Sequence, residues 1–205
     1  MQININKKSG ALIVIATLLV AGILGYSFNR EGDDSFPGMH GNHSTSMDDS
    51  SATSSTKYTG ADVMFLQMMI PHHQQAIDIS NIALKTSQDS ELLALARTII
   101  KAQTREIVQM KSWLDNAGAS AETGHSMGMG GMLDDAELSA LAAAGGKSFD
   151  KLWLEGMIEH HDGAIHMTQM IEDAQNKEIK EFGMAIVEDQ SLQIEQMKAL
   201  LTRLP

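Results

Sequence analysis

The 205-residue sequence predicts an all-α fold, a four-helix bundle made of two repeated αα-hairpins. Two observations carry this prediction. A nine-residue motif occurs twice, as MIPHHQQAI at 69–77 and as MIEHHDGAI at 157–165. In addition, apolar residues recur with the period of a helix along two long segments, 59–117 and 148–204. A duplicated helical unit of this length predicts two similar hairpins that pack on each other.

The chain begins with a segment typical of export. Lys7 and Lys8 precede an uncharged, mostly apolar run, ALIVIATLLVAGILGYSF, at 11–28. A basic flank before such a run predicts a signal peptide or membrane anchor within residues 1–30. The run is barely long enough to span a bilayer, and no clear Ala-x-Ala cleavage site follows it. We favour an uncleaved anchor, and in either case expect the rest of the chain in the periplasm or on the extracellular face.

The composition excludes several classes of protein. The chain has no cysteine, which rules out disulfides, thiolate ligands and a lipoprotein anchor, and it has 15 methionines. Residues 31–205 carry 12 basic and 26 acidic side chains. This acidic balance argues against nucleic acid or anionic lipid as a partner and favours cations. We therefore expect contact with a membrane only through the N-terminal segment.

Two segments without an apolar period are predicted to be flexible. Residues 31–58 are rich in Ser, Thr, Asp and Gly and predict a disordered linker. Residues 118–132 predict a flexible connecting loop between the hairpins. An exposed loop has no core for methionine to fill, so we favour metal capture over coincidence as the role of its Met and His residues. These candidates are Met39, His40, His43 and Met47 in the linker, and His125, Met127, Met129 and Met132 in the loop.

Each repeat predicts two antiparallel helices, 60–86 with 89–116 and 149–174 with 177–203. The second helices also match each other, as QTREIVQMK from Gln103 and QSLQIEQMK from Gln190.

Between the hairpins, LDDAELSALAAAGG predicts a short helix, with Asp134 or Asp135 as its cap and Gly145 or Gly146 as its stop. Pro71 lies inside the first helix, where we expect a kink rather than a break.

The first histidine of each pair is predicted to face the core. At 100° per residue, the first helix of each repeat has one apolar stripe with this histidine at its middle, flanked by His73 or His161. In the second helix of the first repeat, Gln103 interrupts an apolar stripe of Ala96, Ile107, Met110 and Leu114, and antiparallel pairing predicts it level with its histidine, as it does Gln190 in the second repeat. The stripes of the first helices are Phe65, Met69, His72, Ala76, Ile79 and Ala83, and Trp153, Met157, His160, Ala164, Met167 and Ile171.

This pattern permits two interpretations. One is a buried His–Gln network that only fixes the packing of the bundle. The other is a metal site, because imidazole suits copper, zinc and nickel while thioether selects soft ions, above all Cu(I). The spacing Met-x-x-His-His puts sulfur and nitrogen within one helical turn, and its duplication favours the metal site. His166 is expected on the surface, and helix capping or first-turn charge accounts for Asp62 and Asp150.

The doubled motif, each copy preceded by Asp62 or Asp150, resembles the bacterial domain of unknown function 305 family over about residues 58–204. The resemblance implies a ferritin-like four-helix bundle, here over 59–205, and a copper-binding role. Members commonly place methionine two residues after Ala-Ile, which Met167 fits and Ile79 does not, implying a weaker site or fewer sulfurs in the first half. The ligands that it implies by position are Met69, His72 and His73 with Met157, His160 and His161.

We therefore expect an extracytoplasmic copper-binding protein for buffering, trafficking or resistance, with Cu(I) favoured over Cu(II) and Ag(I). A copper-exporting or copper-accepting protein would be its partner. No general base, nucleophile or phosphate loop is evident, so an enzyme is not expected.

Three alternatives remain open. A di-iron redox enzyme would need Glu-x-x-His on a core helix, but the sequence has this pattern only from Glu122 to His125, in the loop. A haem bundle protein with Met/His ligation is the second alternative. The third is a structural or partner-binding helical module whose histidines sense pH.

Overall fold

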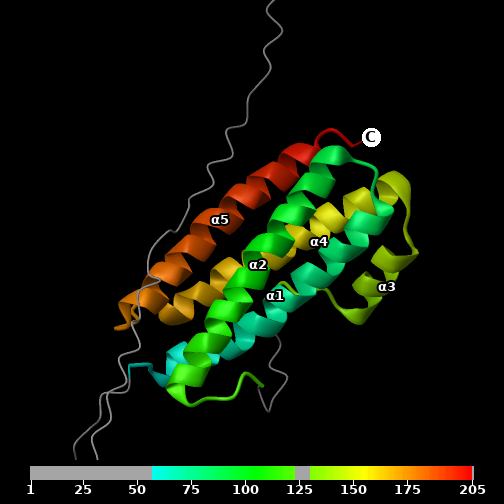
Figure 1. The fold of residues 1–205 in the computed structure, drawn as a ribbon. Coiled ribbons are helices and arrows are strands. Elements are labelled where there is room, and N and C mark those ends of the chain that lie inside the picture. Colours follow the sequence, from blue (N-terminus) through cyan, green and yellow to red (C-terminus); the bar gives the residue numbers. More distant parts are fainter. Residues whose placement is uncertain (1–56, 123–129, 205) are drawn as a thin grey trace, which may run out of the picture. The chain divides into compact units, whose positions relative to one another are not determined.

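The computed structural model describes residues 57–122 and 130–204 (Figure 1). Within these two ranges all regular structure is helical, which confirms the predicted all-α bundle of two hairpins. The helices are α1 (Gly60–Thr86), α2 (Ser90–Ala117), α3 (Asp135–Ala143), α4 (Gly146–Met167), the 3-10 helix η1 (Thr168–Ile171) and α5 (Lys177–Leu201). The predicted anchor and almost all of the 31–58 linker lie outside the described residues. None of the described helices is both long and apolar enough to cross a membrane.

Local side-chain hydrogen bonds explain where the helices begin. Thr59 Oγ1 accepts from the Asp62 backbone N at 3.1 Å, and the Asp62 carboxylate accepts from the Thr59 backbone N at 2.7 Å. This reciprocal capping box fixes the start of α1 and confirms the capping role predicted for Asp62. Asp134 and Glu137 form the same arrangement at α3, so the first of its two predicted caps is the one used.

Three predicted boundaries are wrong. The helix α4 begins at Gly146 rather than at 149, so Asp150 lies beyond its first turn and does not cap it. The helix α3 ends at Ala143, before the glycine pair that was expected to stop it. Gly145 is instead the extended N-cap of α4, and Gly146 has a φ of 55°, a conformation that glycine adopts without steric cost. The long helix predicted to reach 174 ends at Met167 and tightens into η1.

The helix α1 continues through Pro71 without a break, as predicted. It also runs antiparallel to α4. The late part of α1 packs with the early part of α4, and the early part of α1 with the late part of α4. Because α2 therefore runs in the same direction as α4, the connection that contains α3 must pass from one end of the bundle to the other (Figure 1). One long crossover of this kind is the topology of ferritin-like bundles.

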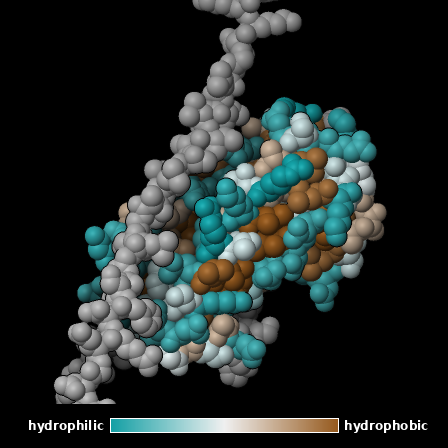
Figure 2. Space-filling model, in the orientation of Figure 1, coloured by the Kyte–Doolittle hydropathy of each residue, from teal (hydrophilic) through white to brown (hydrophobic). Residues whose placement is uncertain are grey.

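The hydrophobic core has two parts. One part, the Trp153 cluster, contains Ala76, Ile79, Ala83, Leu92, Ile99, Trp153, Met157 and Met197 among others. The other, the Phe65 cluster, contains Phe65, Met69, Ile107, Met110, Ala164, Met167, Ile171 and Ile186 among others. On the outside, hydrophilic side chains cover much of the face shown in Figure 2, with apolar patches between them.

Along the sequences of α1 and α4, buried histidines lie between residues of the two core clusters. On α1 the paired histidines separate Met69 of the Phe65 cluster from Ala76 of the Trp153 cluster. On α4 they separate Met157 from Ala164 in the same way. We call the buried residues His72, His73, Gln103, His160, His161, Gln190 and Gln193, together with Glu106, the polar layer.

Candidate metal centre in the polar layer

The four paired histidines meet near the middle of α1 and α4, and their side chains are removed from solvent. His72, His73, His160 and His161 each have a relative exposure of 0%. The rings of His72 and His160 are 3.8 Å apart between centroids, with an angle of 43° between their planes. Burial of four imidazoles without function is costly, because each brings two polar nitrogens out of water.

Each histidine uses its Nε2 atom in a hydrogen bond. His73 Nε2 contacts Glu106 Oε2 at 2.7 Å, and His161 Nε2 contacts Gln193 Oε1 at 2.7 Å. His160 Nε2 is 3.0 Å from the backbone oxygen of His72, and His72 Nε2 is 3.3 Å from that of Gly130. Carbonyl and carboxylate oxygens only accept hydrogen bonds, so each Nε2 carries the hydrogen and donates it. In the neutral ring, the lone pair is therefore on Nδ1.

The Nδ1 atoms are the part of the layer without protein partners. All four are buried and have no hydrogen-bond partner among the described residues. Both polar atoms of the Gln103 side-chain amide and the Oε1 atom of Gln190 are also buried without a hydrogen-bond partner among the described residues. A His–Gln network that merely fixed the packing would satisfy these atoms, as buried polar atoms nearly always are. The four Nδ1 atoms and the Oε1 atoms of Gln103 and Gln190 instead offer lone pairs to a guest, either water or an ion, while Gln103 Nε2 can only donate.

The histidines are held in the form that binds metals. Burial lowers the pKa of His72 to about 3 and the pKa of His161 to about 4. Burial also holds the pKa of His160 well below its usual value of 6.5. These three rings are therefore neutral at pH 7, so no proton has to leave before a metal ion binds.

Buried thioethers flank the polar layer on both sides. Met69 and Met157 are each 0% exposed, and they belong to the Phe65 and Trp153 clusters, respectively. Met167 lies in the same cluster as Met69, while Ile79 lies with Met157. Each side of the layer thus combines residues from both repeats. Ile79, which stands where family members commonly have methionine, lies in the Trp153 cluster with Met157. The cluster with one methionine fewer is therefore the one that contains the motif methionine of the second repeat.

A glycine turn covers one edge of the layer. The Gly130–Gly131 turn, where Gly131 has a φ of 82°, packs against α4 at Gly163. A Cβ at Gly163 would overlap the Gly130 carbonyl oxygen, the atom that accepts from His72. The next turn of the connection is held by Gln75, whose amide bonds both the N and O atoms of Leu133 at 2.9 Å. The contact with Gly163 and the hydrogen bonds from Gln75 therefore fix the position of the Gly130 carbonyl, the partner of His72.

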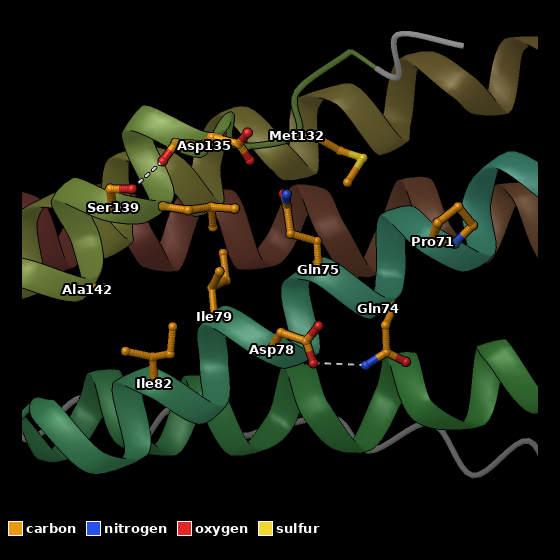
Figure 3. Close-up of a pocket in the computed structure, with 11 residues that line it drawn as sticks. Pro71, Gln74, Gln75, Asp78, Ile79, Ile82, Met132, Asp135, Ser139 and Ala142 are labelled. Carbon is orange, nitrogen blue, oxygen red and sulfur yellow. Dashed lines mark hydrogen bonds between the residues drawn. The ribbon is translucent and has the colours of Figure 1, made fainter. Parts of the chain in front are cut away.

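An open, mostly apolar groove of about 780 Å³ lies beside this turn, between α1 and α3. Figure 3 shows Gln75 and Met132 on its walls, with Pro71 at the same end. The thioether of Met132 is partly exposed, and Met132 follows Gly130, whose carbonyl accepts from His72, by two residues.

The structure brings together only some of the predicted site residues. The four histidines share the polar layer, Met69, Met157 and Met167 flank it, and His166 is exposed on the surface as expected. In the described ranges, no three His, Asp or Glu side chains already converge on one point where they would hold an ion. The loop and linker candidates Met39, His40, His43, Met47, His125, Met127 and Met129 lie outside the described residues.

Sequence reasoning missed the partners of the second histidines. Glu106 and Gln193 bond His73 and His161, whereas Gln103, predicted level with His72, has no bonded partner for its amide. A signal was present, since Glu106 and Gln193 follow the interrupting glutamines by three residues in both repeats. They lie on the same helix face as those glutamines.

Known structures resemble the chain over most of its length. The "putative secreted protein DUF305" of Streptomyces coelicolor is 33% identical, with 69% of this chain and 91% of that chain covered and a TM-score of 0.66. A DUF305 fragment from Deinococcus radiodurans is 32% identical, with coverage of 71% and 98% and a TM-score of 0.67. CopM in its Cu(I)-bound form is 35% identical, with coverage of 71% and 96% and a TM-score of 0.60.

No curated protein sequence matches the chain. The family model described as "Domain of unknown function (DUF305)" matches residues 62–201, which include both hairpins and the whole polar layer. The chain therefore belongs to the DUF305 family.

Proposed function

We propose that this chain is an extracytoplasmic copper-binding protein that buffers, carries or sequesters copper, with Cu(I) as its favoured ion. The observation that supports the proposal most strongly is the set of four neutral, fully buried imidazoles whose Nδ1 atoms have no described protein partner. An ion held there would be bound through Nδ1, while each Nε2 donates to an oxygen. Oriented rings of this kind are typical of histidines that ligate metals.

The choice of ion follows from the thioethers. Met69 and Met157 lie one helical turn from the histidines of their own motifs. Thioether sulfur binds Cu(I) and Ag(I) well and is a poor ligand for harder divalent ions. The copper-free and metal-bound forms in which CopM has been solved, with Cu(I), Cu(II) or Ag, are consistent with this choice.

The proposal is one of binding rather than catalysis, in line with the absence of an evident general base or nucleophile in the sequence. The location rests on the basic and apolar N-terminal segment, 1–30, and agrees with the description of the Streptomyces relative as secreted. A copper-exporting or copper-accepting protein would supply or receive the ion.

Competition titration tests the proposal. The purified full-length chain is titrated with Cu(I), Ag(I), Cu(II) and Zn(II), each against a chelator of known affinity. We expect the chain to take Cu(I) and Ag(I) from chelators that retain Zn(II). A chain that removes neither monovalent ion from a weak chelator is not a Cu(I)-binding protein.

A further inference from the structure

The two repeats differ in charge at one equivalent position of the polar layer. His73 donates to the carboxylate of Glu106, and His161 donates to the amide oxygen of Gln193, both over 2.7 Å. Glu106 and Gln193 follow the equivalent Gln103 and Gln190 by three residues each, so they occupy the same place in the two hairpins. The same hydrogen bond is therefore made once to a charged group and once to a neutral group.

The charge at Glu106 is poorly screened. The side chain of Glu106 is 21% exposed and that of its partner His73 is 0% exposed. Charges that are mostly buried are screened by salt much less than charges on the surface. Asp189 of α5 is close enough for its carboxyl group to interact with that of Glu106, because burial and then the charges of Glu106 and Glu188 raise the pKa of Asp189, while Arg105 lowers it. Glu106 bonds His73 directly, whereas it reaches His161 only through its charge, which opposes the lowering of the His161 pKa by burial. The effect of the carboxylate is therefore strongest at His73.

A carboxylate behind a ligating imidazole changes which ions the imidazole favours. It makes the ring a more basic ligand, and its attraction for a cation grows with the charge of that cation. A neutral amide orients the ring equally well but lacks the second effect. Two otherwise similar half-sites would therefore differ in their preference for divalent over monovalent ions.

We propose that Glu106 is a specificity-determining residue that makes the His73 half of the polar layer the one suited to a divalent ion such as Cu(II). The His161 half, with Gln193, is suited to a monovalent soft ion. Glu106 acts through His73 and need not touch the ion. The inference rests on the proposed function, and assigns different ions to the two halves of the same layer.

The two repeats supply the variants for the test. Glu106→Gln gives the first half the partner that the second half already has, and Gln193→Glu does the reverse. The double variant exchanges the two partners and keeps the net charge. Glu178→Gln is the control, because it removes one negative charge from an exposed residue whose partner is Lys57, outside the layer. Circular dichroism checks that each variant remains helical.

Full-length chains are titrated with Cu(II) and, separately, with Ag(I) against competing chelators. Glu106→Gln keeps an acceptor that orients His73 but removes the negative charge, so it should weaken Cu(II) binding by about 10–100-fold, the usual effect of mutating the partner of a ligating histidine, and should weaken Ag(I) binding less. Gln193→Glu should strengthen Cu(II) binding. The double variant should regain much of the Cu(II) affinity that Glu106→Gln loses, and the control should match the wild type.

The outcomes separate this inference from the proposed function. If the wild-type chain binds neither ion, the proposed function is wrong and the inference with it. If the wild type binds metal but Glu106→Gln loses equal affinity for Cu(II) and Ag(I), or none for either, the inference alone is overturned. Since Glu106→Gln copies a pairing that already exists in the fold, this result does not depend on whether Gln193→Glu folds.

Discussion

The polar layer should make the metal-free protein sensitive to mild acid. The perturbation is a decrease in pH from 7.5 to 5. His72, His160 and His161 have pKa values below 6.5 in the folded state because they are buried. Above pH 6.5 these rings are neutral in both the folded and the unfolded chain, so they add no pH dependence. Below pH 6.5, the unfolded chain takes up protons that the folded chain does not, so the free energy of unfolding decreases as the pH falls.

The size of this effect follows from the number of such rings. One unit of pKa difference is worth about 1.4 kcal/mol, so each ring removes about 1.4 kcal/mol for each pH unit below about 6. Three rings together remove about 4 kcal/mol per unit. The window extends down to about pH 4, where His161 begins to be protonated in the folded state. Over these two pH units the loss reaches about 8 kcal/mol, a large part of the roughly 5–15 kcal/mol by which domains are usually stable, so the metal-free bundle should be strongly destabilised near pH 4.

Urea denaturation at a series of pH values, followed by circular dichroism in the presence of a chelator, measures this slope. The control is the double variant His72→Leu with His160→Leu, which keeps only His161 of the three. Its slope should be about one third as steep between pH 6 and pH 5. Equal slopes for the wild type and the double variant would show that the buried histidines do not control acid stability, and would refute the reasoning.

Three further predictions concern the same layer. At pH 7.5 the double histidine variant should be as stable as the wild type or more so, because leucine replaces rings whose buried Nδ1 atoms are unsatisfied, while its Cu(I) affinity collapses in a chelator competition. Met69→Leu with Met157→Leu should change the free energy of unfolding by less than about 1.5 kcal/mol, yet lower Cu(I) and Ag(I) affinity and spare Zn(II), as titration of each ion would reveal. Gly163→Ala should cost about 1–3 kcal/mol in urea denaturation because its Cβ overlaps the Gly130 carbonyl. Gly156→Ala, which meets only a flexible leucine side chain at 3.0 Å, should cost less.

The overall fold was predictable because hydrophobic period and duplication both depend on the local sequence. The stripes through Met69 and Met157 placed the correct faces of α1 and α4 in the core, and every residue predicted on them is buried. The Thr59–Asp62 capping box is a pattern within four residues and was read in part. The buried face of a helix and its capping residues can therefore be predicted from the sequence of that helix alone.

The errors have a different origin. Gly145 and Gly146 look like a helix stop, but the same pair starts α4, because glycine suits both places. The partners of His73 and His161 depend on the longitudinal shift between two helices. Pairing by a common midpoint predicted the correct helices, but the bonded residues are one turn further along. The contact of Gly130 with His72 involves a connection that has no period from which to predict its path.

The most direct test of the central claim is nitrogen NMR of the histidine rings in ¹⁵N-labelled full-length protein. The claim is that the buried rings donate through Nε2 and offer Nδ1 to a soft metal ion. In the metal-free protein, the four rings of the polar layer, assigned through single substitutions, should carry their hydrogen on Nε2. On addition of Ag(I), the resonances of the ligating rings should shift at Nδ1, with a silver–nitrogen coupling at that atom. Hydrogen on Nδ1 in these rings, or Nδ1 resonances that Ag(I) leaves unchanged, would show that the buried histidines do not bind a soft ion through Nδ1.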